Sequence, residues 1–148
     1  MSLLFSRSCE YALQAVLYLA RESKDLPVQL HDISAALNIP YHFLSKVLQS
    51  LTRDALVVSH KGPNGGFTLG RPASEAFLID IVCAIDGETF FDSCVLGFPS
   101  CGDSSPCPAH QSWKEAKQII QDMLRNKTIA DLSGALEPKL SLIEQLSH

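Results

Sequence analysis

The sequence has no apolar run long enough to cross a membrane, because polar or charged residues interrupt every hydrophobic stretch. Its start also lacks a basic segment followed by an apolar stretch and a small-residue cleavage site. We therefore expect a cytoplasmic protein with no membrane partner. The 148 residues, 46% of them hydrophobic, are enough for a folded domain with its own core.

Motifs for catalysis are missing as well. No serine, cysteine or threonine has the sequence context of an activated nucleophile, and no second metal-cluster motif is present. The segment Gly62-Pro63-Asn64-Gly65-Gly66 is rich in glycine, but it does not lie between a strand and a helix as a phosphate-binding loop does. We therefore do not expect an enzyme.

Positive charge is scarce overall but unevenly distributed. The net charge of −4 argues by itself against a nucleic-acid partner, because phosphate contacts need Lys and Arg. Residues 1–72, however, carry a net charge of +2, and residues 73–148 carry −6. This division suits a protein that presents one face to DNA and keeps the other away from it.

Helical periodicity covers most of the chain. Helices are predicted over residues 8–22, 30–37, 74–86 (ending at Gly87), 112–126 and, capped by Thr128, 129–136, with a tail from Pro138. A further helix follows Pro40, and its apolar stripe consists of Phe43, Leu44, Val47, Leu48 and Leu51. The two short helices on either side of Asn38 and Ile39 resemble a helix-turn-helix.

A β-hairpin is predicted directly after these helices. Residues 55–60 and 67–69 are strand-like, and the glycines, Pro63 and Asn64 between them favour a tight reversal with Lys61 at its tip. The predicted fold class is therefore mainly α with a small β-hairpin, a winged helix-turn-helix followed by a long C-terminal helix. We expect a DNA-binding domain at 1–72, a linking helix and loop at 73–109, and a dimerisation helix and tail at 110–148.

The winged helix predicts where DNA would bind. The N-terminal part of the second helix of a helix-turn-helix faces base edges in the major groove, and a basic wing reaches a neighbouring phosphate or the minor groove. The candidate residues are Tyr41, His42, Ser45 and Lys46 on the helix and His60, Lys61 and Asn64 on the wing. The alternative for each is a solvated side chain. A two-fold homodimer formed through helix 112–126 would match a palindromic double-stranded operator.

The loop over residues 88–108 carries the most distinctive chemistry. Its pattern Cys94-x6-Cys101-x5-Cys107-x2-His110 gathers three thiols and an imidazole, which in a cytosolic protein indicates a metal site. Thiolates select zinc or iron-sulfur clusters, and gaps this wide favour the cluster over zinc. We expect the other cysteines, Cys9 and Cys83, to be small core or boundary residues.

The arrangement resembles the bacterial iron-sulfur regulators of the IscR, NsrR and RirA type over nearly the whole chain. The resemblance rests on Glu10-Tyr11-Ala12-Leu13, on the wing residues 61–67, on the three loop cysteines and on Thr128-Ile129-Ala130-Asp131-Leu132. It implies a homodimeric transcription regulator whose DNA binding is controlled by a cluster that senses iron, redox state or nitric oxide. A [2Fe-2S] cluster is favoured over [4Fe-4S].

The resemblance also implies ligands. Cys94, Cys101 and Cys107 match the cluster cysteines of this family; the fourth ligand is His110, as in IscR-like members, or Glu10, as in NsrR-like members, where the partner subunit can supply it. Two departures are present: the first cysteine gap is one residue longer than in IscR, and Lys61 replaces the usual wing Arg, which removes a bidentate donor. The rival functions are a regulator that is stabilised by zinc or free of metal, and an iron-sulfur electron carrier.

Overall fold

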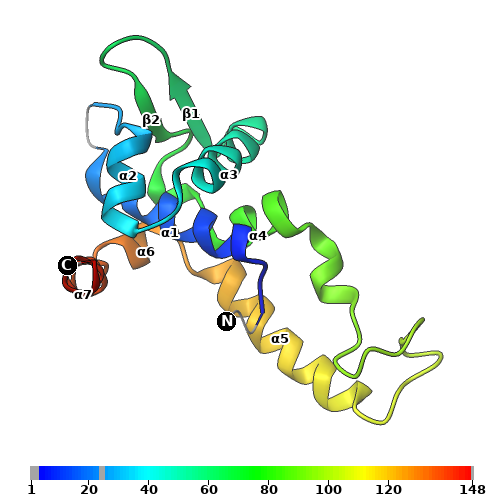
Figure 1. Ribbon diagram of the computed structural model, residues 1–148. Coiled ribbons are helices and arrows are strands. Elements are labelled where there is room, and N and C mark those ends of the chain that lie inside the picture. Colours follow the sequence, from blue (N-terminus) through cyan, green and yellow to red (C-terminus); the bar gives the residue numbers. More distant parts are fainter. Residues whose placement is uncertain (1–3, 24–25, 148) are drawn as a thin grey trace.

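A computed structural model describes residues 4–23 and 26–147 and shows a mainly helical molecule with one hairpin (Figure 1). Residues 1–3, 24 and 25 of the predicted 1–72 domain and residue 148 of the predicted 110–148 segment lie outside the described residues. The elements are α1 (Arg7–Glu22), α2 (Leu30–Leu37), α3 (Tyr41–Arg53), β1 (Val57–His60), β2 (Gly66–Leu69), η1 (Ala73–Glu75), α4 (Leu78–Asp86), η2 (Glu88–Asp92), α5 (His110–Asn126), α6 (Ile129–Ser133) and α7 (Glu137–Leu146).

Helix α1 is the centre of the core. Ser6 caps its first turn by accepting a hydrogen bond from the Cys9 N–H. Its buried residues, among them Ala12, Val16 and Leu19, face the other helices, and α1 contacts α2, α3, α4 and α6. Its small buried residues, Ala12 and Ala15, let several helices approach α1 closely, so α1 fixes the relative positions of the elements around it.

The turn between α2 and α3 is held by local hydrogen bonds. Asn38 ends α2 in the left-handed conformation (φ 53°), which asparagine tolerates better than most residues. The Ser34 hydroxyl donates to the Ile39 carbonyl at 2.6 Å, and the Ile39 side chain is buried. The helix-turn-helix is therefore a rigid unit, with α3 anchored on the core through Leu44, Leu48 and Leu51.

The hairpin is a wing joined to the body by a third short segment. Strands β1 and β2 are antiparallel with Val57 opposite Leu69, and Val28 pairs with Phe67 through two backbone hydrogen bonds of 2.8 and 2.9 Å. A Cβ at Gly66 would lie 2.4 Å from the Val28 carbonyl oxygen, and Gly66 has φ +150°. Glycine is therefore required where the wing crosses Val28.

The predicted helix over 74–86 is interrupted. Residues 73–75 form η1, and α4 begins only at Leu78, because Ala76–Phe77 is extended and pairs with the end of α5. The Leu78 N–H donates to the Lys127 carbonyl, and the Ile129 N–H donates to the Ala76 carbonyl at 2.8 Å. The Asp80 carboxylate accepts from the Phe77 N–H at 2.9 Å and thereby starts α4. Gly87 ends α4, as predicted.

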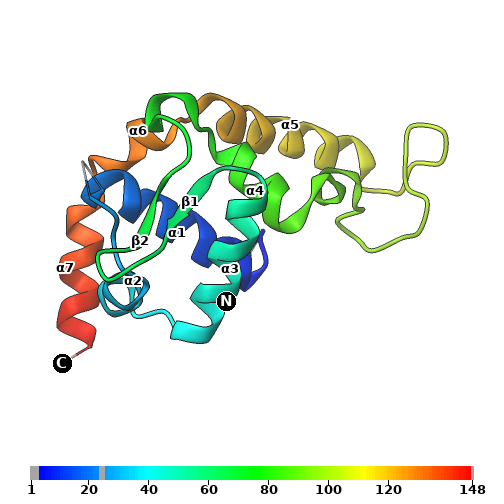
Figure 2. The same ribbon diagram turned by 90° about the horizontal axis from the view of Figure 1, so that it is seen from above.

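Helix α5 extends away from the body and carries the cysteine loop, residues 93–109, at its far end (Figure 2). Leu124 is the fully buried residue of α5, packing with Cys9 and Val82. Ile119 and Met123, in contrast, are 73% and 45% exposed. Two apolar side chains of the helix that is predicted to form the dimer are thus uncovered within one chain.

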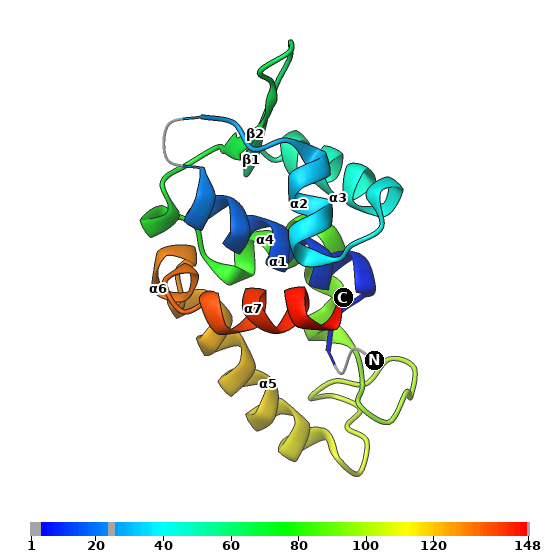
Figure 3. The same ribbon diagram turned by 60° about the vertical axis from the view of Figure 1, so that its left-hand side comes forward.

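The C-terminal segment returns to the body. Thr128 caps α6 by accepting from the Asp131 N–H at 3.0 Å, as predicted, but α6 ends at Ser133 rather than at residue 136. The tail forms helix α7, which lies across α1 and α2 (Figure 3). Leu140 and Ile143 pack on the core, and Arg21 of α1 forms an ion pair with Glu137.

The predicted fold class is confirmed, with one error in the predicted core. Phe43, which the sequence places in the apolar stripe of α3, is 59% exposed and lines a hollow with Ser8, Lys46 and Ile85. The stripe that Leu44, Leu48 and Leu51 already form is wide enough to pack α3, so Phe43 falls outside it. None of the described helices combines the length and apolar character needed to cross a bilayer.

Candidate functional site

The cysteine loop brings its three thiols together. The sulfur atoms of Cys94, Cys101 and Cys107 all lie within 4.8 Å of one another, and those of Cys94 and Cys107 are 3.5 Å apart. All three are free cysteines with half-buried side chains. Residues thirteen positions apart in the chain therefore converge on one point, although the loop between them contains no regular helix or strand.

The loop backbone favours a thiolate at this point. Desolvation tends to raise the pKa of the Cys94 thiol, but hydrogen bonds from the Phe98 and Leu96 backbone and from the neighbouring thiols outweigh it and lower the pKa to about 7. The pKa of Cys107 is raised, first by desolvation and then by its hydrogen bond with Cys94. A thiolate therefore forms more readily at Cys94 than at Cys107, and a bound cation would favour the thiolate at both.

His110 lies directly beside this group at the first position of α5. Its Nδ1 atom is 3.4 Å from the Cys101 sulfur, and its Nε2 atom is 2.9 Å from Oδ1 of Asp103. Asp103 is also bonded to the Lys114 ammonium at 3.2 and 3.3 Å. His110 therefore begins α5, and its Nδ1 atom also lies close enough to the thiols to bind the same metal.

The base of the loop is fastened to α5. The Trp113 indole N–H donates to the Ser93 carbonyl at 2.8 Å, and the Lys117 ammonium donates to the Phe91 carbonyl at 2.7 Å. Lys117 also lies over the Trp113 ring, 5.8 Å from its centroid. The sequence predicts a helix here but does not indicate that Trp113 and Lys117 hold the loop, although their spacing of four residues places them on one face of that helix.

The donor set fits a soft metal centre. Four-coordinate zinc sites with thiolate ligands place their sulfurs roughly 3.8 Å apart, close to the separation of Cys94 and Cys107. Three thiols with a neighbouring imidazole also suit an iron-sulfur cluster with one non-thiolate ligand. Hard oxygen-seeking ions such as magnesium do not match these donors. The side chains therefore agree with the predicted class of metal, and they fit both zinc and iron.

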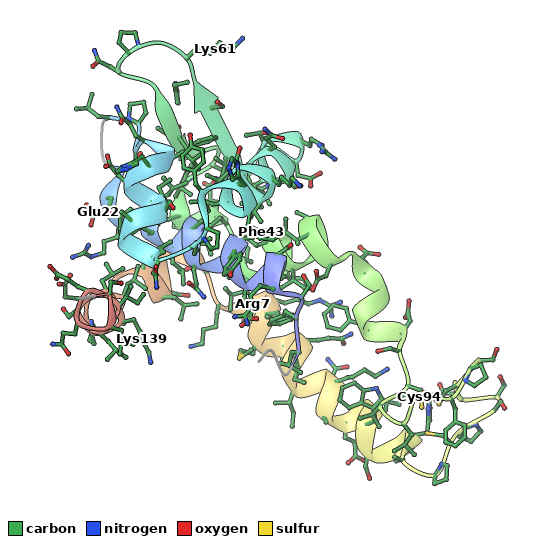
Figure 4. All side chains as sticks on the ribbon, in the orientation of Figure 1. Arg7, Glu22, Phe43, Lys61, Cys94 and Lys139 are labelled. Atoms are coloured by element: carbon green, nitrogen blue, oxygen red, sulfur yellow. The ribbon has the colours of Figure 1, made fainter. Side chains whose placement is uncertain are left out.

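Glu10, the alternative fourth ligand, is not brought to the cysteines within one chain. It lies in the first turn of α1, in the body of the molecule, whereas the loop with Cys94 lies at the far end of α5 (Figure 4). Its Oε1 atom is buried without a hydrogen-bond partner among the described residues. A carboxylate oxygen in that position is costly unless another group meets it, such as one from a second subunit.

The two remaining cysteines are packed away from the loop, as predicted. Cys9 is fully buried between Val82 and Leu124. Burial, followed by the nearby carboxylates of Asp86 and Glu10, raises the pKa of its thiol to about 12. Cys83, on α4, is half-buried, and burial raises its pKa as well. Both therefore remain thiols at neutral pH, and neither belongs to the group of cysteines gathered in the loop.

The residues predicted to read DNA lie at the opposite end of the molecule, on α3 and the wing (Figures 1 and 4). Tyr41, His42 and Lys46 are exposed on α3, and Ser45 is half-exposed. Lys61 and Asn64 are exposed on the wing. His60 differs, because its Nε2 atom bonds across the hairpin to the Thr68 hydroxyl at 2.8 Å and so also holds the wing.

Comparison with known proteins finds transcriptional regulators. A model of the Rrf2 family, described as an iron-dependent transcriptional regulator, matches residues 5–135. A protein of Aquifex aeolicus, named as a candidate HTH-type transcriptional regulator, is 34% identical over 140 residues, covering 93% of this chain and 96% of that protein. The HTH-type transcriptional regulator IscR of Yersinia pestis is 34% identical over 122 residues, which cover 82% of this chain and 74% of IscR.

Solved structures show the same fold. CymR, the global cysteine regulator of B. subtilis, superposes with a TM-score of 0.76 at 23% identity, covering 90% of this chain and 98% of CymR. IscR of T. potens gives a TM-score of 0.73 at 24% identity, covering 94% and 92%. The relatives are named transcriptional regulators, which agrees with the expectation that the chain is not an enzyme.

Proposed function

Because the chain belongs to the Rrf2 family of transcriptional regulators, we propose that it is a DNA-binding homodimer whose operator affinity is controlled by an iron-sulfur cluster held by Cys94, Cys101 and Cys107. The convergence of three free thiols within 4.8 Å on one loop carries this proposal. His110 is the fourth ligand that lies nearest, and Glu10 of a second subunit is the alternative. We favour a [2Fe-2S] cluster.

Each of the three predicted segments would have its own role. Residues 1–72 would bind a palindromic operator through Tyr41, His42, Ser45, Lys46, Lys61 and Asn64, with His60 supporting the wing. Residues 73–109 would hold the cluster, and α5 would pair with its counterpart, because its exposed Ile119 and Met123 need a covering surface. A two-fold dimer then presents two copies of α3 to successive major grooves.

A continuous path of contacts supports control of DNA binding by the loop. The loop is fastened to α5 by Trp113 and Lys117, and α5 is bridged to α4 where Leu78 bonds to Lys127. Helix α4 packs against both α1 and α3. When bound, the cluster supplies a centre that can be oxidised, reduced or lost. A loop that is ordered differently in these states would shift α5, and with it the spacing of the two α3 helices.

The first experiment is to purify the protein without oxygen and to measure visible absorption together with iron, sulfide and zinc. We expect a coloured protein with comparable amounts of iron and sulfide. A colourless protein containing zinc would contradict the proposal and favour a zinc-stabilised regulator, for which chelation would unfold the loop. If the protein contains neither iron nor zinc, the conclusion would be a DNA-binding regulator without a cluster.

Replacing Lys46 with Ala should weaken operator binding. An ammonium that contacts a phosphate displaces a counterion, so the slope of log affinity against log salt should become shallower by about one per subunit. Fluorescence anisotropy with labelled operator over a salt series measures both quantities. Lys139→Ala is the matched control, since Lys139 is exposed on α7, away from α3 and the wing (Figure 4). Affinity that is unchanged at every salt concentration would exclude Lys46 from the interface.

A further inference from the structure

His110 makes a polar contact through each of its two ring nitrogens. Nδ1 faces the Cys101 sulfur at 3.4 Å, and Nε2 faces Asp103 at 2.9 Å. The Asp103 carboxylate is itself held by Lys114, one turn further along α5. The imidazole is therefore clamped between the thiol group and a carboxylate on the loop, and the carboxylate is tied to the helix that His110 begins.

The chemistry of these three groups determines which ring nitrogen of His110 carries the proton. An ionised carboxylate can only accept hydrogen bonds, so the proton of a neutral imidazole must be on Nε2. The Asp103 carboxylate faces both the Nε2 atom of His110 at 2.9 Å and the Lys114 ammonium at 3.2 and 3.3 Å, so two donors surround it. The lone pair of Nδ1 is then free and directed at the sulfur group. Metal-binding histidines are oriented in this way when the second nitrogen donates to a carboxylate.

A contribution to stability does not explain this arrangement. The side chains of Asp103 and Lys114 are 76% and 55% exposed, and exposed ion pairs add little to the free energy of unfolding. The His110 side chain, by contrast, is only 16% exposed. The hydrogen bonds of Asp103 therefore act mainly on the orientation of the largely enclosed His110 ring.

We propose that Asp103, held in place by Lys114, is a positioning residue that keeps the proton of His110 on Nε2 and directs Nδ1 to the metal centre as the fourth ligand. This inference rests on the proposed function, and it adds which nitrogen binds and what selects it. Because Lys114 lies on α5 and Asp103 on the loop, the same contact ties the orientation of the ligand to the position of the loop on the helix.

One test needs no cluster. Long-range ¹H–¹⁵N NMR spectra of the reduced, metal-free protein should show neutral His110 as the Nε2–H tautomer, and Asp103→Ala should convert it to a mixture of tautomers. Asp92→Ala is the matched control, because Asp92 is an exposed carboxylate at the end of η2, and it should leave the spectrum unchanged. A wild-type His110 that carries its proton on Nδ1 would overturn the proposal.

A second test uses the loaded protein. In Asp103→Ala the transfer of iron to a chelator should become on the order of ten-fold faster, as is typical when the partner of a metal-binding histidine is removed. The same substitution in a His110→Cys background should have no effect, because a thiolate there needs no tautomer selection. An equal acceleration in both backgrounds would show that Asp103 merely supports the loop. If iron release is not accelerated in either background, Asp103 is not a positioning residue.

These outcomes separate the inference from the proposed function. If the wild-type protein takes up no iron and sulfide under anaerobic reconstitution, the proposed function fails, whatever the NMR result shows. If the wild-type protein holds a cluster but Asp103→Ala changes neither the tautomer nor the rate of iron release, only the role of Asp103 fails.

Discussion

Cys101→Ala should yield a colourless protein that remains a folded dimer. Cys101 supplies one of three thiols within 4.8 Å of one another, and its sulfur also contacts Nδ1 of His110 at 3.4 Å. Its removal leaves two thiols and an imidazole with no protein ligand at the third sulfur position. We expect iron and sulfide to fall to background levels after anaerobic reconstitution, which is a complete loss of the visible absorption of the cluster.

The fold should survive this change. Cys101 lies in the loop beyond η2, away from the buried residues of the core, and a substitution at a half-exposed loop position usually changes the free energy of unfolding by no more than about 0.5 kcal/mol. Circular dichroism and size-exclusion chromatography with light scattering check the fold and the dimer. Cys83→Ala is the control, because Cys83 lies on α4 and the variant should keep its cluster. Cluster absorbance retained in Cys101→Ala would remove this residue from the site.

Leu48→Ala should destabilise the protein by about 3 kcal/mol. Leu48 is fully buried on the face of α3 that packs on the core, so truncation loses transfer free energy and leaves a cavity under the helix. A domain with a typical stability of about 5–15 kcal/mol would lose a large part of it. Operator binding should weaken too, because α3 carries Tyr41, His42 and Lys46.

Urea unfolding at a fixed protein concentration measures this effect, since the stability of a dimer depends on concentration. Gln49→Ala is the matched control: Gln49 is the next residue on α3 and is exposed, so the free energy of unfolding should change by no more than about 0.5 kcal/mol. A destabilisation below about 1 kcal/mol for Leu48→Ala would mean that α3 is not anchored on the core through this side chain.

Local sequence signals are sufficient to predict the elements at the end of the molecule that we propose binds DNA. Helices α1, α2 and α3 and the wing lie within about two residues of their predicted positions, because Pro40 and the glycines between Lys61 and Phe67 mark the boundaries and apolar residues recur at helical spacing. The sequence also predicts that the three loop cysteines form one group, because three thiols in a single loop of a cytosolic protein are typical of a metal site.

Features that depend on distant partners could not be predicted. The break at Ala76–Phe77 has no Gly or Pro to mark it and arises because this segment pairs with residues 127–129. Helix α7 was predicted only as a tail, since Pro138 was interpreted as the end of regular structure, whereas proline also suits the first turn of a helix. The contacts between Asp103 and Lys114 depend on the path of the loop, although the spacing of His110 and Lys114 places both on one face of α5.

The attachment of the cysteine loop has a consequence for how such a protein can diversify. The side chains that hold the loop, those of Trp113, Lys114 and Lys117, all come from α5, whereas the residues proposed to read DNA lie on α3 and the wing. Substitutions at sites so far apart usually have additive effects on the free energy of unfolding. In the regulator that we propose, mutation and selection can therefore alter the signal that the loop senses while the recognised DNA sequence stays the same, and a changed α3 can be combined with an unchanged loop.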